Sequence, residues 1–200
     1  MDLRGASVFH LGSFSREVDG RLELLATTEG ALNSLRHHAA LKGTGYDKKV
    51  ITTFRPDDVV DADRADFAAN VKKLGDITGE NTTTWQGYLQ ALRIRRAYFR
   101  DHGATATDHG HPTAATADLS DAEAEALFAR VTGETVSAAD AELFRAHMLT
   151  VMAGMSLDDG LVMQLHPGSF RNHNTELSSA FGPDAGADIP TQTDYVHAMK

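Results

Sequence analysis

The chain has 200 residues, of which 42% are hydrophobic and 24% charged, enough for one globular domain with a sizeable core. Its formal net charge of −9 argues against nucleic acid as the main partner, because phosphate binding requires a basic face. The absence of cysteine excludes disulfides and thiolate metal sites and fits a cytoplasmic protein, and no apolar run is long enough to indicate a transmembrane helix.

The first half of the chain alternates between strand and helix patterns. Residues 21–29, RLELLATTE, are typical of a short strand that ends in hydroxyls and a carboxylate. Helical spacing of apolar residues follows over 32–41. The β-branched segment KVITTF, residues 49–54, predicts a second strand, which Arg55-Pro56-Asp57 ends. A helix is then expected over 61–74.

The second half repeats this alternation with longer helices. A strong helix pattern covers 85–102, and ATATD, residues 104–108, is a weak strand candidate. A capping-box sequence at 120–123 opens a helix that is expected to run to about residue 131. A further helix is expected over 138–157, a strand over 161–166 and a last helix over 193–200.

Strands that alternate with helices predict parallel pairing through helical crossovers, hence an α/β fold. The chain contains no Gly-x-Gly-x-x-Gly after a strand and no Gly-Lys-Ser/Thr phosphate loop. A nucleotide-binding doubly wound fold therefore has little support.

Each predicted strand ends in a polar group that can take part in chemistry. Thr28, Arg55, Asp108 and His166 follow the four strands in turn. In a (β/α) barrel the active site is assembled at the carboxyl ends of the strands. Each group also has a purely structural explanation, since an Arg before Pro can cap a helix, an Asp-His pair can organise a turn, and a histidine after a strand is commonly a loop residue.

Five segments resemble uronate isomerase, the glucuronate/galacturonate isomerase branch of the amidohydrolase superfamily. They are LLATTEGALNSLRHH (24–38), FRPD (54–57), TDHG (107–110), MQLHPGSFRNHN (163–174) and FGPDAG (181–186). The resemblance covers roughly residues 22–200 and corresponds to the central part of the family's barrel, whereas residues 1–21 do not match. It implies a (β/α)8 TIM-barrel-type fold, of which about four β/α units are present.

The resemblance implies interconversion of D-glucuronate with D-fructuronate and of D-galacturonate with D-tagaturonate. Such an isomerisation requires proton removal beside a carbonyl and stabilisation of the resulting oxyanion. By this resemblance His166 and Asp108 are the catalytic candidates. The candidate substrate-binding residues are Arg55, whose guanidinium suits a carboxylate, together with Arg171, Asn172, Asn174 and Thr28. The three loop residues 171, 172 and 174 have an equally good reading as a hydrogen-bonded scaffold.

The family's metal ligands have no match in this chain. The family holds a divalent cation, expected to be zinc, through a His-x-His after the first barrel strand and an Asp after the eighth. His109-Gly110-His111 has the same spacing but falls in the matched Asp-His turn, and we interpret it as coincidence. No metal is therefore expected to be bound by this chain alone.

Two alternatives to an active isomerase are also compatible with the sequence. One is a truncated, non-catalytic barrel fragment that needs the rest of the chain or a partner. Open sheet edges would favour self-association or a homo-oligomer. The other is a different metal hydrolase of the amidohydrolase superfamily. The expected partner of the chain is a small-molecule uronate substrate, with neither nucleic acid nor membrane.

Overall fold

The computed structural model describes residues 23–133, 135–182 and 185–199. The segment 1–21, predicted not to match the family, lies outside these described residues. A four-stranded sheet has the order β1-β2-β3-β4, and every neighbouring pair is parallel. Its strands are β1 (Leu25–Gly30), β2 (Val50–Arg55), β3 (Ala106–His109) and β4 (Val162–Leu165). The predicted α/β fold with four parallel strands is confirmed, with bounds that differ by a few residues.

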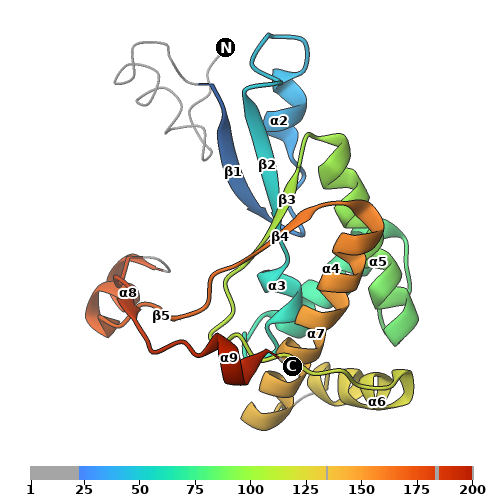
Figure 1. Ribbon diagram of the computed structural model, residues 1–200, viewed down its shortest axis with the longest axis vertical. Helices are drawn as coiled ribbons and strands as arrows, with labels where there is room; N and C mark the ends of the chain where they lie inside the picture. The colour runs from blue at the N-terminus through green and yellow to red at the C-terminus, as the bar shows by residue number, and fades with distance from the viewer. Residues whose placement is uncertain (1–22, 134, 183–184, 200) are drawn as a thin grey trace.

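Helices cover one side of this sheet. Figure 1 shows α4, α5 and α7 on one side of the strands and α8 with β5 on the other. The helices that precede the carboxy-terminal segment are α2 (Arg36–Leu41), α3 (Asp57–Val60), α4 (Phe67–Thr78), α5 (Trp85–Asp101), α6 (Asp121–Val131) and α7 (Ala138–Asp159).

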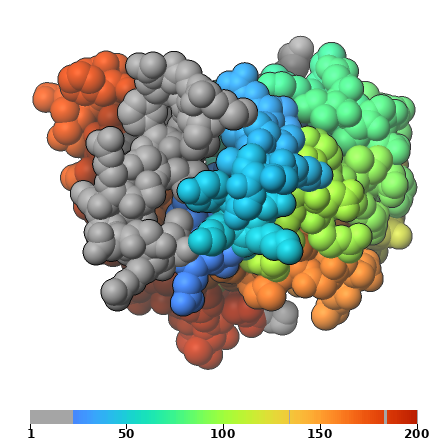
Figure 2. All heavy atoms as spheres, turned by 90° about the horizontal axis from the view of Figure 1, so that it is seen from above, coloured from blue at the N-terminus to red at the C-terminus, as the bar shows by residue number. Residues whose placement is uncertain are grey.

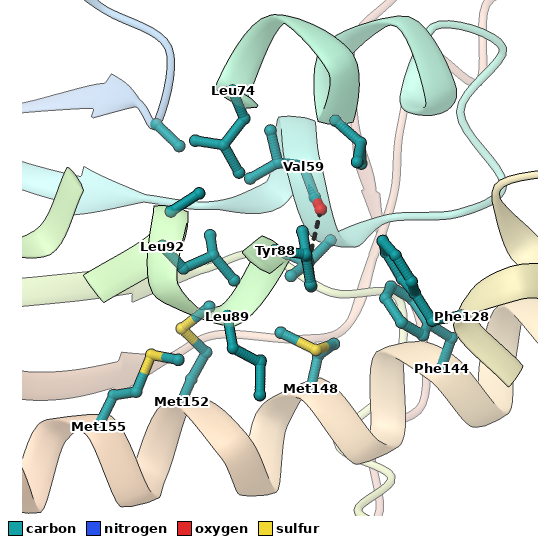
Figure 3. Close-up of a cluster of buried hydrophobic side chains, with 14 of the residues drawn as sticks. Val59, Leu74, Tyr88, Leu89, Leu92, Phe128, Phe144, Met148, Met152 and Met155 are labelled. Carbon is teal, nitrogen blue, oxygen red and sulfur yellow. Dashed lines mark hydrogen bonds between the residues drawn. The ribbon is translucent and has the colours of Figure 1, made fainter. Parts of the chain in front are cut away.

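The main core lies among α4, α5, α6 and α7. In Figure 3 Met148, Met152 and Met155 of α7 point toward Leu89 and Leu92 of α5. All five of these side chains are buried. This apolar contact therefore holds together α5 and α7, which belong to different β/α units.

A polar contact ties the short helix α3 to this core. Tyr88 of α5 is fully buried, and its hydroxyl donates to the carbonyl oxygen of Val59 at 2.8 Å (Figure 3). A buried hydroxyl must find a partner, and here the partner is the backbone of the segment that follows β2. The end of β2 is thereby fixed against α5.

The helix predicted over 61–74 begins later than expected, at Phe67. Residue Asp61 is extended after α3, and the carboxylates of Asp61 and Asp63 accept hydrogen bonds from Arg145 of α7 at 2.8 and 2.5 Å. This tertiary contact holds the segment out of the helix, and hydrophobic periodicity carries no signal of it.

The predicted helix 32–41 is likewise shorter, because Leu35 adopts the left-handed region with φ 50°. Its amide donates to the side chain of Asn33 at 2.7 Å, which stabilises a turn ahead of α2. The predicted capping box is confirmed, because Ser120 forms a full capping box with Glu123. The Ser137 side chain likewise caps α7 by accepting from the Asp140 amide.

The carboxy-terminal segment contains elements that the sequence patterns did not indicate. Strands β5 (Ser169–Phe170) and β6 (Ile189–Pro190) pair antiparallel, with α8 (Thr175–Phe181) between them, and α9 (Tyr195–Ala198) lies within the predicted helix 193–200. Neither α8 nor α9 has a buried residue. Seen from above, the orange-red segment that includes α8 and the green helices lie at opposite ends of the molecule (Figure 2).

Candidate active site at the carboxyl ends of the strands

Three of the four predicted strand-end residues meet at one edge of the sheet. Asp108 Oδ1 lies 2.5 Å from Nε2 of His166, and Asp108 Oδ2 lies 3.7 Å from Nη1 of Arg55. The backbone amide of His166 donates to the carbonyl oxygen of His109 at 3.1 Å and so continues the β3–β4 pairing. Three strands thus bring a cation, a carboxylate and an imidazole together.

The alternation of side chains along a strand explains this grouping. Phe54 and Thr107 are paired across β2 and β3 and are fully buried, and the Phe54 ring packs edge-on against Phe99 of α5 at 5.0 Å. The next residue in each strand, Arg55 and Asp108, points to the opposite face. That face is the one α4, α5 and α7 do not cover.

Thr28 stays apart from this group. It pairs with Thr53 near the end of β1, and it is exposed. Among the described residues it makes no side-chain hydrogen bond with Arg55, Asp108 or His166. Its neighbour Glu29 turns to the helix-covered face, where it accepts a hydrogen bond from Thr52.

Asp57 and Gly110 belong to the site although they were not among the predicted site residues. Asp57 Oδ2 accepts from Arg55 Nε at 2.7 Å and from the Gly110 amide at 3.3 Å. A Cβ atom on Gly110 would lie 2.1 Å from Arg55 Nη2, so the guanidinium rests directly on bare backbone. Both residues lie in the FRPD and TDHG motifs, and that shared motif context was the available signal.

A cavity of about 510 Å³ opens beside Arg55, Asp57 and Gly110, and its lining does not include Asp108 or His166. Its walls carry charges of both signs, from three arginines and three aspartates: Arg55, Arg64, Arg171, Asp57, Asp58 and Asp61. The loop that follows β4 contributes Arg171, Asn172 and Ser169. The cavity is therefore of a size and polarity suited to a small polar ligand.

One of the cavity aspartates is held by backbone amides. Asp58 Oδ1 accepts from the Ala31 amide at 3.2 Å, and a Cβ on Gly30 would lie 2.7 Å from Asp58 Oδ2. Burial raises the pKa of Asp58, and its hydrogen bonds to the amides of Ala31 and Leu32 act in the opposite direction. These contacts join the end of β1 to the start of α3.

The predicted loop residues support one another as well as the cavity wall. Arg171 pairs with Asp188 at 2.7 Å, and the same carboxylate accepts from the Asn172 amide at 3.1 Å. Asn174 caps α8 by accepting from the Leu177 amide at 3.0 Å. Arg171 and Asn172 thus line the cavity, whereas the described role of Asn174 is that of a helix cap.

His109 and His111 lie behind the site, buried and partly without partners. Their rings are 5.9 Å apart, and His109 Nδ1 and both ring nitrogens of His111 have no hydrogen-bond partner within the described parts of the chain. Burial and then the neighbouring His111 lower the pKa of His109 to about 3, and burial also lowers that of His111.

These two histidines do not complete a metal centre. The nearest carboxylate oxygen is Asp57 Oδ1, 3.9 Å from His111 Nε2. Within residues 23–133, 135–182 and 185–199, no group of three or more His, Cys, Asp or Glu is arranged to hold a metal ion. The residues present therefore do not fit a bound divalent cation.

Comparisons with known proteins place these features in one family. The family model described as glucuronate isomerase matches residues 17–200. The chain is 61% identical over 179 residues to the uronate isomerase of Phenylobacterium zucineum, and 63% identical over 179 residues to that of Rhizorhabdus wittichii. Both matches cover 90% of this chain but only 37% and 38% of those relatives. The chain thus spans less than two fifths of their length.

Solved structures give the same picture. The glucuronate isomerase of Caulobacter crescentus superposes with a TM-score of 0.87 at 50% identity, over 97% of this chain and 40% of that one. The uronate isomerase of Thermotoga maritima superposes with a TM-score of 0.84 at 28% identity, over 90% of this chain and 41% of that one. The four parallel strands and their helices are thus part of a TIM-barrel-type fold.

Proposed function

Because the chain belongs to the glucuronate isomerase family, we propose that it forms part of an enzyme that interconverts D-glucuronate with D-fructuronate and D-galacturonate with D-tagaturonate in hexuronate catabolism. The observation that carries this proposal is the family match together with the Arg55–Asp108–His166 cluster at the strand ends. Neither a different metal hydrolase nor a non-catalytic fragment is favoured by the comparisons.

The imidazole of His166 is the group that moves a proton in this proposal. An ionised carboxylate can only accept, so the contact with Asp108 places the hydrogen of the neutral ring on Nε2. Nδ1 then takes or returns the proton as the carbonyl moves from C1 to C2. Asp108 holds the ring in one orientation and stabilises its charged form.

Arg55 anchors the substrate carboxylate. A guanidinium binds a carboxylate through two parallel hydrogen bonds, which fixes direction as well as distance. Arg171 and Asn172 form the facing wall of the cavity, and Asn174 supports the loop that carries them. Holding the anion at one end sets the distance between C2 and His166.

A divalent cation, which we propose to be zinc, completes the enzyme. The family is one of metal-dependent, amidohydrolase-like isomerases. Such a cation polarises a carbonyl oxygen. Since the described residues do not fit it, no step assigned here to His166, Asp108 or Arg55 passes through the metal.

Two further properties belong to the same proposal. We place the enzyme in the cytoplasm, in keeping with the absence of cysteine. Within the described part of the chain, no helix is long and apolar enough to cross a membrane.

We also propose self-association through the outer strands β1 and β4, which light scattering coupled to size-exclusion chromatography would detect as a mass above 21.6 kDa.

The test is a chimera in which residues 23–199 replace the matched segment of the Caulobacter crescentus enzyme. Formation of fructuronate from D-glucuronate is followed by a coupled reduction assay. Robust turnover by the chimera is expected, and little or none by the 200-residue chain alone. An inactive but folded chimera would contradict the proposed function, and robust turnover by the isolated chain would contradict the placement of the metal.

A further inference from the structure

Arg55 is held by a clamp that joins the end of β2 to the end of β3. We propose that Asp57 is the positioning residue of this arginine: it fixes the guanidinium through Nε so that the end formed by Nη1 and Nη2 is presented to a carboxylate ligand. The inference rests on the proposed function in one respect, namely that the ligand is a uronate.

The first support is the geometry of the Arg55–Asp57 contact. The Nε–Oδ2 distance is 2.7 Å, whereas the nearest approach of Asp108 to the guanidinium is 3.7 Å at Nη1. A short, charge-assisted hydrogen bond at Nε fixes the direction of the planar group more strongly than the longer ion pair does. Of these two contacts, the one with Asp57 therefore does more to set which edge of the guanidinium faces the cavity.

The second support is that Asp57 is itself held in place. Its two carboxylate oxygens lie 3.4 and 3.3 Å from the Gly110 amide nitrogen, which donates to them. Pro56 comes directly before it, and α3 begins at Asp57. A carboxylate fixed from two strands can orient a flexible arginine, whereas a freely rotating one cannot.

The third support is the lack of a side chain at residue 110. A Cβ there would meet Arg55 Nη2 at 2.1 Å and Asp57 Oδ2 at 3.0 Å. The guanidinium therefore lies between the Asp57 carboxylate and the backbone of Gly110, the residue that follows β3. Gly110 is needed for this close approach, which gives a second way to disturb the clamp without changing any charge.

A different role for Asp57 is competition with the ligand for Arg55. Removing the negative charge of Asp57 would make Arg55 more attractive to an anion if the two carboxylates merely competed for the same guanidinium. Positioning and competition therefore predict opposite changes in affinity for the substitution Asp57→Asn.

The experiment measures this chain by NMR in two ways. Hydrogen exchange of the Arg55 Nε–H reports the clamp, and titration with D-glucuronate reports binding. We expect a slowly exchanging Nε–H in the unmodified chain, and fast exchange with about tenfold weaker glucuronate binding in Asp57→Asn, the loss typical of one charge-assisted hydrogen bond. Gly110→Ala should weaken binding in the same direction, and Asp57→Glu should restore part of it.

Asp140→Asn is the matched control, because Asp140 accepts from Arg130 at 2.8 Å in an exposed pair between α6 and α7. It should change neither readout. Equal or tighter glucuronate binding by Asp57→Asn, or an unchanged Nε–H exchange rate, would overturn the proposal. If the unmodified chain does not bind glucuronate, the uronate assignment fails, and the exchange rates still decide whether Asp57 holds Arg55.

Discussion

The side chain of Arg55 lies between the carboxylates of Asp57 and Asp108, at 2.7 and 3.7 Å. An ammonium in its place reaches one oxygen at a time and cannot reproduce the planar, two-pronged contact. In the chimera described above, Arg55→Lys is expected to raise the KM for glucuronate roughly 10- to 100-fold, as expected for the loss of one hydrogen bond to a charged group. Arg130→Lys, on the exposed α6 pair, serves as the control, and an unchanged KM for Arg55→Lys would remove Arg55 from the site.

His166 is predicted to act on the rate. Proton transfer by a positioned side chain contributes about 10²- to 10⁴-fold, so His166→Ala should lower kcat by that order with a smaller change in KM. The matched control is His197→Ala, because His197 also contacts an aspartate, Asp194, at 2.6 Å but lines no part of the cavity. Steady-state kinetics of both variants in the chimera provide the measurement, and equal kcat values would contradict the assignment.

The buried imidazole of His109 makes stability depend on pH. Its pKa is about 3 in the folded chain against 6.5 for the free side chain, so only the unfolded chain takes up the proton between these values. The contribution of the neutral His109 ring to the free energy of unfolding is thus fully present above pH 6.5, and it is lost as the pH falls toward 3. The loss at pH 5 is about 2 kcal/mol. Urea unfolding at pH 7 and pH 5 should show it, and His109→Gln should reduce the difference. A pH-independent unfolding free energy would contradict this.

At the scale of elements, a buried arginine joins two long helices. Arg96 of α5 is 1% exposed and donates to both carboxylate oxygens of Asp159 at the end of α7, at 2.6 and 2.9 Å. Its Nη2 also donates to Ser156 at 2.9 Å. The contact holds α5 and α7 in one register beside the sheet.

Breaking this contact should be costly. Arg96→Ala removes the cation and leaves a cavity beside Phe54, so we expect a loss of about 3–5 kcal/mol in the free energy of unfolding. Chemical denaturation followed by circular dichroism gives the value. The exposed pair between Arg130 and Asp140 is the comparison, since Arg130→Ala should lower the free energy of unfolding far less than Arg96→Ala does. Similar losses for the two variants would contradict the role of Arg96.

The helices and strands show how far local patterns determine this fold. The helices α5, α6 and α7 were predicted to within two residues, because their ends carry capping side chains or glycine and their apolar spacing is regular. By contrast, β5, β6 and α8 are too short for periodicity to identify. They are positioned by contacts such as Arg171–Asp188, which join residues 17 positions apart.

The residues of the candidate site likewise fall into those that the sequence predicted and those that it did not. Arg55, Asp108 and His166 were found because each follows an apolar strand, and parallel strands bring their carboxyl ends together. Asp57 and Gly110 were missed as site residues because their roles depend on atoms of β2 and β3 that meet only in the folded chain. In the sequence, an aspartate at the start of a helix and a glycine in a loop carry no signal of these contacts beyond the motifs that contain them.

At the scale of the whole molecule, the metal content of the chain can be tested. The described residues offer no group of metal ligands, so we predict that this chain retains no stoichiometric zinc or manganese after extensive dialysis. Elemental analysis by mass spectrometry provides the measurement. Bound metal that His109→Ala or His111→Ala removes would assign a metal role to these two histidines and contradict the prediction.

The sheet has the same strand order as the sequence, β1-β2-β3-β4. Within this sheet each strand after β1 therefore pairs with the strand synthesised directly before it, and no strand has to wait for one beyond its immediate successor. Domains generally fold as they emerge, and rates fall as contacts become more distant in sequence. This topology allows the β/α units to assemble one after another during translation, with Asp108 and then His166 added last to an edge where Arg55 is already in place.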